Sequence, residues 1–434
     1  MRVRRWSQHI ALAALSALVG WTGLSSGSAF AQIEQPDVVT ERAASSTPHL
    51  AATDEVKRPL ALAVEQSQDT MFVGGKFAAV EDATRTSTVT RDNLVAFSAT
   101  SGDISSTFKP SVDGMIFAVR AIGDSVYIGG KFTSVDGVSR PTIAKLDART
   151  GAVDPDFQPA MRGGRVSEIR LVDGRLLVGG TFRQKLIALN PITGRNTGYL
   201  DVPIDGRLDL TTSKTEVYRF AVDPAGSRLI GIGNFTTVGG ENRKRAFMLN
   251  LGADRAVLSP WYYAPLDKKC RSNTPTRQPY LDDVDFSPNG SYFVFGATGY
   301  VPATDAEIGT AVCDAVARFE TDVLAPVKPT WINYTGGDTI HSVAATGAAV
   351  YVQGHFRWLD NPYGMDSEGP GAVDRKGVGA VDSTTGRALA WAPQAPAAQG
   401  GQDILATDAG VWFASDSSRF NYRYHRGIAF APLP

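Results

Sequence analysis

The segment Phe72-Val73-Gly74-Gly75-Lys76-Phe77 carries the pattern that decides the fold, because it recurs along the chain. Near-copies are Gly129-Gly130-Lys131-Phe132 and Gly179-Gly180-Thr181-Phe182. Weaker copies bring the total to seven and lie at residues 233–235, 296–299, 354–356 and 412–415. The copies are roughly 50 to 63 residues apart, slightly more than the spacing of four-stranded propeller blades and far more than that of helical solenoid repeats.

A second pattern follows each copy. It is a short apolar strand that ends in Asp or Asn, often just before a Thr-Gly turn. The cleanest examples are Ile143-Ala144-Lys145-Leu146-Asp147, ahead of Thr150-Gly151, and residues 186–190, ahead of Thr193-Gly194. Tight hairpins need a residue at positive φ, which glycine adopts without steric cost, and we expect the recurring glycines to serve such turns. This second pattern also occurs seven times.

Length and composition agree with one large all-β domain. The chain has 434 residues, 44 of them glycine, and 20% charged residues, which suits many short strands joined by turns. We therefore predict a seven-bladed β-propeller of four-stranded blades over residues 47–434. The net charge of -1 gives no electrostatic attraction to nucleic acid or to an anionic membrane, so we expect no nucleic-acid partner and a monomer.

The first 31 residues are predicted to be a signal peptide. Arg2, Arg4 and Arg5 form a basic start, residues 10–24 are largely apolar, and Ala29-Phe30-Ala31 offers small residues around a cleavage point. This predicts a secreted protein at the cell exterior. No later segment reaches about 18 uninterrupted apolar residues, so no transmembrane segment is expected. Residues 32–46 are polar and are predicted to be a flexible lead-in.

The two ends of the propeller are predicted to meet. The last repeat stops at the strand 428–431, with no fourth strand after it. Thr47-Pro48-His49-Leu50 lies ahead of the first repeat, in the place of a fourth strand. We expect this N-terminal segment to complete the last blade and to cover its unpaired edge.

Cys270 and Cys313 are the only cysteines. In an exported protein such a pair predicts a disulfide, with two buried free thiols as the alternative. A zinc site would need two further ligands, and none is suitably spaced, so no metal or cofactor is predicted. The acidic run Asp282-Asp283-Val284-Asp285 could supply calcium ligands or paired carboxylates, but residues that line a wet channel or cap a turn are the stronger interpretation.

The Gly-Gly-x-Phe and Leu-Asp-x-x-Thr-Gly patterns, with Phe157-Gln158-Pro159, resemble the delta-60 type propeller repeats of secreted bacterial proteins. Residues 343–361 are also similar to a group of exported actinobacterial propellers. The resemblance covers most of residues 58–432. It implies the blade structure but not an activity, because its motifs are structural. Proteins of this kind are largely uncharacterised and often accompany carbohydrate-binding or cell-surface modules.

Loop length points to a functional face. The loops 297–314 and 355–377 are long for connections between the second and third strands of a blade, and loops carry function more often than the scaffold does. The candidate ligand-binding residues are His355, Arg357, Trp358, Asp360 and Asn361 in the second loop, and His341, which is predicted to face the channel. An aromatic ring with polar neighbours suits a carbohydrate or peptide ligand. A loop that packs only on itself is the alternative.

These observations predict a secreted binding module that recognises glycan or cell-wall components, or a protein ligand, on its top face. The alternative is an extracellular hydrolase or lyase that acts on glycans. A glycosidase needs two carboxylates roughly 5 to 10 Å apart across the bound sugar. The sequence has no Gly-x-Ser-x-Gly, His-Glu-x-x-His or P-loop motif, and no catalytic residue is assigned.

Overall fold

The computed structural model describes residues 33–434 except 162, 209–213 and 272–279. The predicted signal peptide lies outside the described residues. The described chain is all-β, with only two short 3-10 turns, η1 (Ala264–Asp267) and η2 (Asp305–Glu307). No helix in this part of the chain has the length and apolar character needed to cross a membrane.

Seven small antiparallel sheets form the framework of the described chain. In each sheet three strands follow one another along the sequence, and the second strand lies between the first and the third. In chain order, sheets 1 to 7 are β2 (Leu60–Ser67), β3 (Thr70–Lys76) and β6 (Leu94–Ser98); β7 (Met115–Ile122), β8 (Ser125–Lys131) and β11 (Ile143–Asp147); β12 (Val166–Val172), β13 (Arg175–Gly180) and β14 (Leu186–Leu189); β16 (Glu216–Val222), β17 (Arg228–Asn234) and β20 (Ala246–Leu251); β22 (Tyr280–Phe286), β23 (Tyr292–Thr298) and β24 (Ala315–Glu320); β26 (Thr339–Ala345), β27 (Val350–His355) and β30 (Val378–Val381); and β31 (Gly401–Thr407), β32 (Gly410–Ser415) and β35 (Ile428–Pro432).

The fourth strand is less regular than predicted. Sheets 4 and 5 have one, β21 (Ala256–Leu258) and β25 (Trp331–Tyr334). In sheets 1, 2, 3 and 6 the same place is held by a single β-bridge to the third strand, as in Leu146↔Val153. This segment lies at the outer edge of the sheet and forms a turn with the third strand, which leaves few residues for a ladder.

Short strands in the loops complete the element list. Between the second and third strands of their sheets lie β4 (Ala79–Glu81) and β5 (Thr88–Thr90), β9 (Ser134–Val135) and β10 (Val138–Ser139), β18 (Thr237–Val238) and β19 (Glu241–Asn242), β28 (Trp358–Leu359) and β29 (Val373–Asp374), and β33 (Arg419–Phe420) and β34 (Arg423–Tyr424). β15 (Ile204–Asp205) pairs with β18, and β1 (His49–Ala51) pairs with β4.

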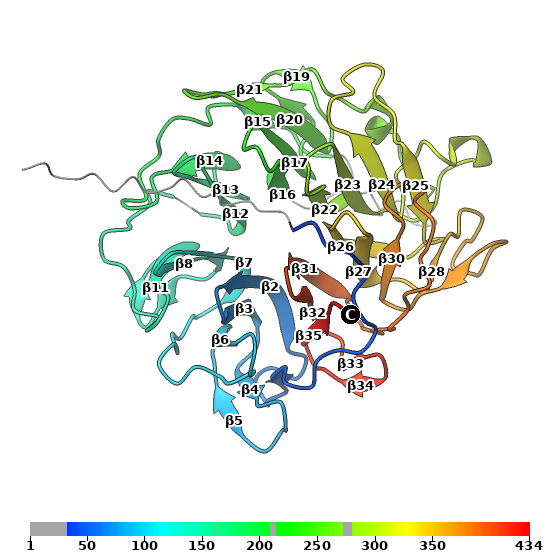
Figure 1. The fold of residues 1–434 in the computed structure, drawn as a ribbon. Coiled ribbons are helices and arrows are strands. Elements are labelled where there is room, and N and C mark those ends of the chain that lie inside the picture. Colours follow the sequence, from blue (N-terminus) through cyan, green and yellow to red (C-terminus); the bar gives the residue numbers. More distant parts are fainter. Residues whose placement is uncertain (1–32, 162, 209–213, 272–279) are drawn as a thin grey trace, which may run out of the picture.

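The sheets are arranged around a common centre, with their first strands innermost (Figure 1). First strands of consecutive sheets contact one another, and β31 of sheet 7 contacts β2 of sheet 1. Each first strand carries a register shift at the same place. The shifted residues are Leu62, Phe117, Ser167, Tyr218, Asp282, His341 and Gln402.

The Gly-Gly signature has a different physical cause from the one expected. Gly74 and Gly75 are not among the residues at positive φ, whereas the turn glycine Gly151 is, at φ 77°. A Cβ on Gly74 would lie 2.5 Å from Cγ2 of Ile116 in the next sheet, and a Cβ on Gly75 would lie 2.1 Å from the carbonyl oxygen of Leu60. The first glycine therefore lets the next sheet pack closely, and the second makes room for the bulged first strand.

The N-terminal segment meets β35 of sheet 7 at Thr40 and Ala44, several residues earlier than expected. The backbone N–H groups of Thr40 and Ala44 donate to the carbonyl oxygens of Pro432 and Phe430 in β35, at 2.8 and 2.7 Å. Val39 and Ala43 are buried there. Within the expected segment, His49 and Leu50 lie in β1, which pairs with β4 in the loop between β3 and β6. The N–H of Leu50 also donates to the carbonyl oxygen of Arg426, just before β35, at 2.9 Å. Residues 32–46 were expected to be a flexible lead-in because they are polar, but their few apolar side chains pack on sheets 6 and 7.

The disulfide between Cys270 and Cys313 is confirmed, with a Cα–Cα distance of 5.8 Å. It joins the connection that follows sheet 4 to the end of the long loop of sheet 5.

Candidate functional site

The two long loops border a groove with a volume of 690 Å³. The groove lies between sheets 5 and 6, so residues from both sheets contribute to it. Its lining combines two tyrosines, three aspartates, an arginine and a histidine with small residues: Tyr280, Thr298, Gly299, Tyr300, Asp314, Gly337, Asp338, Thr339, His355, Arg357 and Asp366. Such a mixture of aromatic and polar groups is typical of sites that bind polar organic ligands.

Arg357 is held in a fixed position at this groove. Its Nε and Nη2 donate to Oδ2 and Oδ1 of Asp338 at 2.8 and 2.9 Å, and the side chain of Asp338 is only 8% exposed. The guanidinium also lies 4.4 Å from the ring centre of Trp358. This two-point ion pair and the stacked ring orient the cation at the edge of the groove.

Two further candidate residues of the loop 355–377, Asn361 and Asp360, are engaged in structural hydrogen bonds. Asn361 is fully buried, donates to the carbonyl oxygen of Ser367 at 3.0 Å and accepts from the N–H of Gly369 at 2.9 Å. Asp360 accepts from Asn333 and from the N–H of Ala388. These two side chains shape the loop and are not part of the groove lining.

The two candidate histidines lie in different places. His355 is exposed and lines the groove, with Nδ1 3.1 Å from the carbonyl oxygen of Ala397. His341 is the shifted residue of β26, and its Nδ1 lies 2.8 Å from Oδ2 of Asp282, the shifted residue of β22. Burial lowers the pKa of His341, but the bond to Asp282 outweighs it, so the pKa is raised.

Asp314 is the buried carboxylate of the groove. It is 2% exposed, and Oδ2 accepts a hydrogen bond from the N–H of Tyr300 at 2.8 Å. Burial raises the pKa of Asp314 to about 7. Tyr300 adopts φ 93°, a conformation that non-glycine residues rarely take and that is often found at functional sites. The sequence analysis named neither residue.

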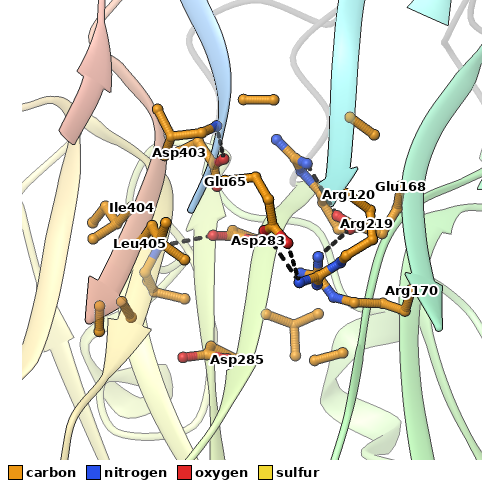
Figure 2. Close-up of a pocket in the computed structure, with 18 of the residues that line it drawn as sticks. Glu65, Arg120, Glu168, Arg170, Arg219, Asp283, Asp285, Asp403, Ile404 and Leu405 are labelled. Atoms are coloured by element: carbon orange, nitrogen blue, oxygen red, sulfur yellow. Dashed lines mark hydrogen bonds and ion pairs between the residues drawn. The ribbon is translucent and has the colours of Figure 1, made fainter. Parts of the chain in front are cut away.

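A second cavity occupies the centre of the molecule, where the first strands of the seven sheets converge (Figure 2). Its volume is 170 Å³. Five carboxylates and three arginines line it: Glu65, Glu168, Asp283, Asp285, Asp403, Arg120, Arg170 and Arg219. Ile33, at the start of the described chain, also belongs to the lining. We call this cavity the central channel.

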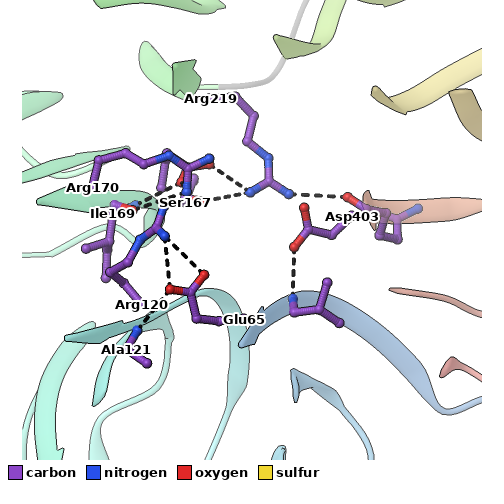
Figure 3. Close-up of polar contacts among 11 residues, drawn as sticks. Glu65, Arg120, Ala121, Ser167, Ile169, Arg170, Arg219 and Asp403 are labelled. Carbon is purple, nitrogen blue, oxygen red and sulfur yellow. Dashed lines mark hydrogen bonds and ion pairs between the residues drawn. The ribbon is translucent and has the colours of Figure 1, made fainter. Parts of the chain in front are cut away.

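Ion pairs between neighbouring sheets tie the wall of the central channel together (Figure 3). Arg120 of sheet 2 binds Glu65 of sheet 1 at 2.9 Å. Glu168 of sheet 3 binds Arg170 on its own strand at 2.7 Å and Arg219 of sheet 4 at 3.0 Å. Arg219 also donates to the carbonyl oxygen of Gln402 in sheet 7, at 3.4 Å, so it reaches across the channel.

Carboxylates of the central channel also accept hydrogen bonds from backbone N–H groups of the neighbouring sheet. Asp283 and Asp285 of β22 accept from the N–H groups of Val343 and Ala345 in β26, each at 2.9 Å. Asp403 of β31 accepts from the N–H of Val64 in β2, also at 2.9 Å. The same type of bond therefore joins the last sheet to the first.

Burial dominates the electrostatics of the channel aspartates. It raises the pKa of Asp283 to about 8, of Asp285 to about 7 and of Asp403 to about 6, although nearby arginines and the backbone N–H groups lower each value. The interpretation of the acidic run as lining a wet channel applies to Asp283 and Asp285. No group of three or more His, Cys, Asp or Glu side chains placed to hold a metal ion occurs in the described ranges.

Sequence reasoning missed most of the channel. The signal was present, because Glu65, Arg120, Arg170 and Asp285 each lie three positions after the shifted residue of their strand. Glu168, Arg219, Asp283 and Asp403 each lie one position after it. An alignment of the repeats on the shifted residue, rather than on the glycines, would have shown that these charged residues occupy equivalent positions.

Comparison with known proteins supports a propeller-type fold. The profile described as "Domain of unknown function (DUF5122) beta-propeller" matches residues 124–157, which include β8 and β11 of sheet 2 but not β7. No curated protein matches the chain in sequence. Hydrazine synthase of Kuenenia stuttgartiensis is similar in structure, with a TM-score of 0.51, 13% identity, and coverage of 84% of this chain and 94% of that one. The computationally designed Ika8 protein gives a TM-score of 0.47 at 11% identity, covering 89% and 98%. The profile match places a β-propeller repeat within this all-β chain.

Proposed function

We propose that the seven sheets are the blades of a closed β-propeller. Three observations support this proposal. The first strands carry the same bulge, β31 contacts β2, and Asp403 accepts the N–H of Val64. The segment 39–44, through its bonds to β35, would supply the outer edge of blade 7. A chain that begins at residue 46 would expose this edge, and we expect it to unfold at lower temperature and to aggregate more readily than a chain that begins at residue 33.

We further propose that the protein is a secreted binding module that recognises glycan at the cell exterior. The observation that carries the proposal is the groove between sheets 5 and 6, which is lined by Tyr280, Tyr300, Arg357 and three aspartates. Sugars offer hydroxyl groups to carboxylates and C–H faces to aromatic rings. The disulfide supports secretion, because such bonds persist in oxidising compartments, and it anchors the loop that carries Asp314.

A glycan-cleaving enzyme is the second candidate. The observation in its favour is Asp314, whose pKa burial raises to about 7 and which feels the negative charge of Asp338. A carboxyl group of raised pKa beside a second carboxylate is the arrangement of a general acid and its partner in glycosidases. Asp338 is already bound by two nitrogens of Arg357, however, which favours recognition over catalysis.

One experiment separates these functions. Immobilised glycans and cell-wall fragments are screened with the wild type, with Arg357→Ala, and with Arg387→Ala as the control, because Arg387 is exposed and lies outside the groove. We expect wild type and Arg387→Ala to retain the same glycans, and Arg357→Ala to lose them, since the groove then loses its arginine and Asp338 keeps only the backbone N–H of residue 357. Release of shortened glycan products would favour the enzyme. Equal retention by all three proteins would reject the groove.

A further inference from the structure

Two smaller hollows flank the groove between sheets 5 and 6. The first, with a volume of 210 Å³, lies between sheets 4 and 5, and its lining includes Tyr218 and Tyr280. The second, with a volume of 170 Å³, lies between sheet 6 and the segment that leads into sheet 7, and its lining includes His355 and Lys376. We call them the first and the second outer hollow. Tyr280 and His355 also line the groove, so the three depressions share walls and form a row along four consecutive sheets.

The row follows from the repeat. Each of sheets 4, 5 and 6 contributes the pair of residues in which the start of its first strand faces the end of its second strand. These pairs lie two positions before the shifted residue of each first strand and are Glu216↔Asn234, Tyr280↔Thr298 and Thr339↔His355. All of these residues line the depressions of the row. Because the sheets are arranged around a common centre, one face presents similar depressions side by side, which suits a ligand that is itself built from repeated units (Figure 1).

The first outer hollow exposes groups that a sugar can bind. Oε2 of Glu216 accepts a hydrogen bond from Arg165 at 3.0 Å, which fixes the carboxylate at the wall. The ring of Tyr218 is half-buried and lies with its centre 5.6 Å from the guanidinium of Arg165. The Tyr218 hydroxyl bonds to none of the described residues and is not among their buried polar atoms, so it is accessible. It can therefore exchange a hydrogen bond with water for one with a sugar hydroxyl.

The second outer hollow presents a cation beside apolar surface. The side chain of Lys376 is 50% exposed, and its Nζ lies 3.6 Å from a carboxylate oxygen of the exposed Asp374. An ion pair between exposed side chains contributes little, so the ammonium group remains available to a ligand. Pro396 and Ala397 add apolar surface to the same lining. Donors next to apolar surface suit the hydroxyl groups and the C–H faces of a sugar.

The volumes indicate how the three depressions act together. Sites for small molecules begin at roughly 300 Å³, so the groove with its 690 Å³ can hold a ligand by itself, whereas each outer hollow is too small. We propose that the row binds consecutive units of a linear glycan chain, with the middle of the chain in the groove and one further unit in each outer hollow. This inference rests on the glycan-binding function proposed above and specifies the ligand as an oligosaccharide chain rather than a single sugar or a disaccharide.

The first arm of the test varies the length of the chain. The probes are the dimer, tetramer and hexamer of β-1,4-linked N-acetylglucosamine, together with the same three lengths of any other glycan that the screen retains. They are titrated calorimetrically into the wild-type protein. We expect the hexamer to bind about tenfold more tightly than the dimer or better, because its end units form hydrogen bonds in the outer hollows while the chain is already held in the groove.

Two variants form the second arm. Tyr218→Phe removes only the hydroxyl group in the first outer hollow, and Lys376→Ala removes the ammonium group in the second. Each should weaken binding of the hexamer several-fold and leave binding of the dimer unchanged. One control is Tyr422→Phe, because Tyr422 is 69% exposed and lies outside the row. The other is Lys131→Ala, because Lys131 is exposed and holds in sheet 2 the position that His355 holds in sheet 6. Both controls should bind the hexamer as the wild type does.

The outcomes separate this inference from the function on which it rests. Equal affinity of the wild type for dimer and hexamer overturns the extended row and leaves glycan binding in the groove standing. A longer chain also offers more alignments to a two-unit site, so a length dependence that Tyr218→Phe or Lys376→Ala keeps in full has that cause and overturns the outer hollow which that variant changes. Failure of every probe and of every glycan in the screen to bind removes both proposals.

Discussion

The groove and the central channel are both lined by many charged side chains, but these differ in how far they are paired and buried. In the channel, Arg120, Arg170 and Arg219 are paired with Glu65 and Glu168, and Asp283 and Asp403 accept backbone N–H groups of the next sheet. In the groove, the side chains of Arg357 and Asp366 are 44% and 54% exposed, so their charges remain open to solvent. The comparison teaches that a charged cavity is not by itself a binding site. What matters is whether its charged side chains remain accessible to a ligand.

The largest expected effect comes from the channel. Glu168→Gln removes the carboxylate that serves two arginines, and its side chain is only 4% exposed. We expect a loss of about 4 kcal/mol in the free energy of unfolding, because two partly buried arginines, with side chains 29% and 12% exposed, lose their shared counter-charge. Urea denaturation measures it, with the exposed Glu241→Gln as the control. A loss similar to that of the control would mean that the channel charges do not hold the sheets together.

Removal of the disulfide tests whether this bond stabilises the protein and keeps the groove in shape. For Cys270→Ser combined with Cys313→Ser we expect a loss of about 3 kcal/mol in the free energy of unfolding, as is typical when a loop of this size is opened. We also expect weaker glycan binding, since Asp314 directly follows Cys313. Calorimetry and a melting curve on the same sample give both values. If the variant is less stable but binds glycan with unchanged affinity, the disulfide is not needed to shape the groove.

Much of the fold could be predicted from the sequence because its repeat is local. The glycines, the strands that end in Asp or Asn and the Thr-Gly turns are read within one repeat, and the cysteine pair needed only a count. The segment at Thr40 and Ala44 was missed because pairing with the end of the chain leaves no local pattern. Arg219 was missed because its partners, Glu168 and Gln402, come from different repeats.

The pH dependence of stability tests whether the aspartates of the central channel are protonated in the folded protein. Burial raises the pKa of Asp283 to about 8 in the folded protein, above the ordinary value of 3.8, so the folded state binds the extra proton between these values. The contribution of Asp283 to stability is therefore greatest in mild acid and falls as the pH rises from about 4 to 8. Asp283→Asn removes this dependence.

We expect the free energy of unfolding of the wild type, relative to that of Asp283→Asn, to be larger at pH 5 than at pH 8. The difference between the two proteins is the informative quantity, because His49 and His425 have pKa values lowered to about 4 and act in the opposite direction in both. A difference that does not change with pH would contradict the buried, protonated state of Asp283.

The smallest expected effect is that of Trp358→Ala. Its ring supports the guanidinium of Arg357 at 4.4 Å, so the substitution should cost about 1 kcal/mol of stacking beyond lost contact area and loosen Arg357 in the groove. Glycan titration and a melting curve measure the two effects. Unchanged affinity with a lower melting temperature would make the loop 355–377 purely a part of the scaffold.

Hydrogen–deuterium exchange with and without bound glycan tests the central claim most directly. The account predicts that glycan protects backbone amides in the loops 297–314 and 355–377, which carry the groove. It also predicts no change at Val64, Val343 and Ala345, whose amides donate to channel carboxylates of the neighbouring sheet. Protection confined to the first strands, with the two loops unchanged, would contradict it and move the binding site into the channel.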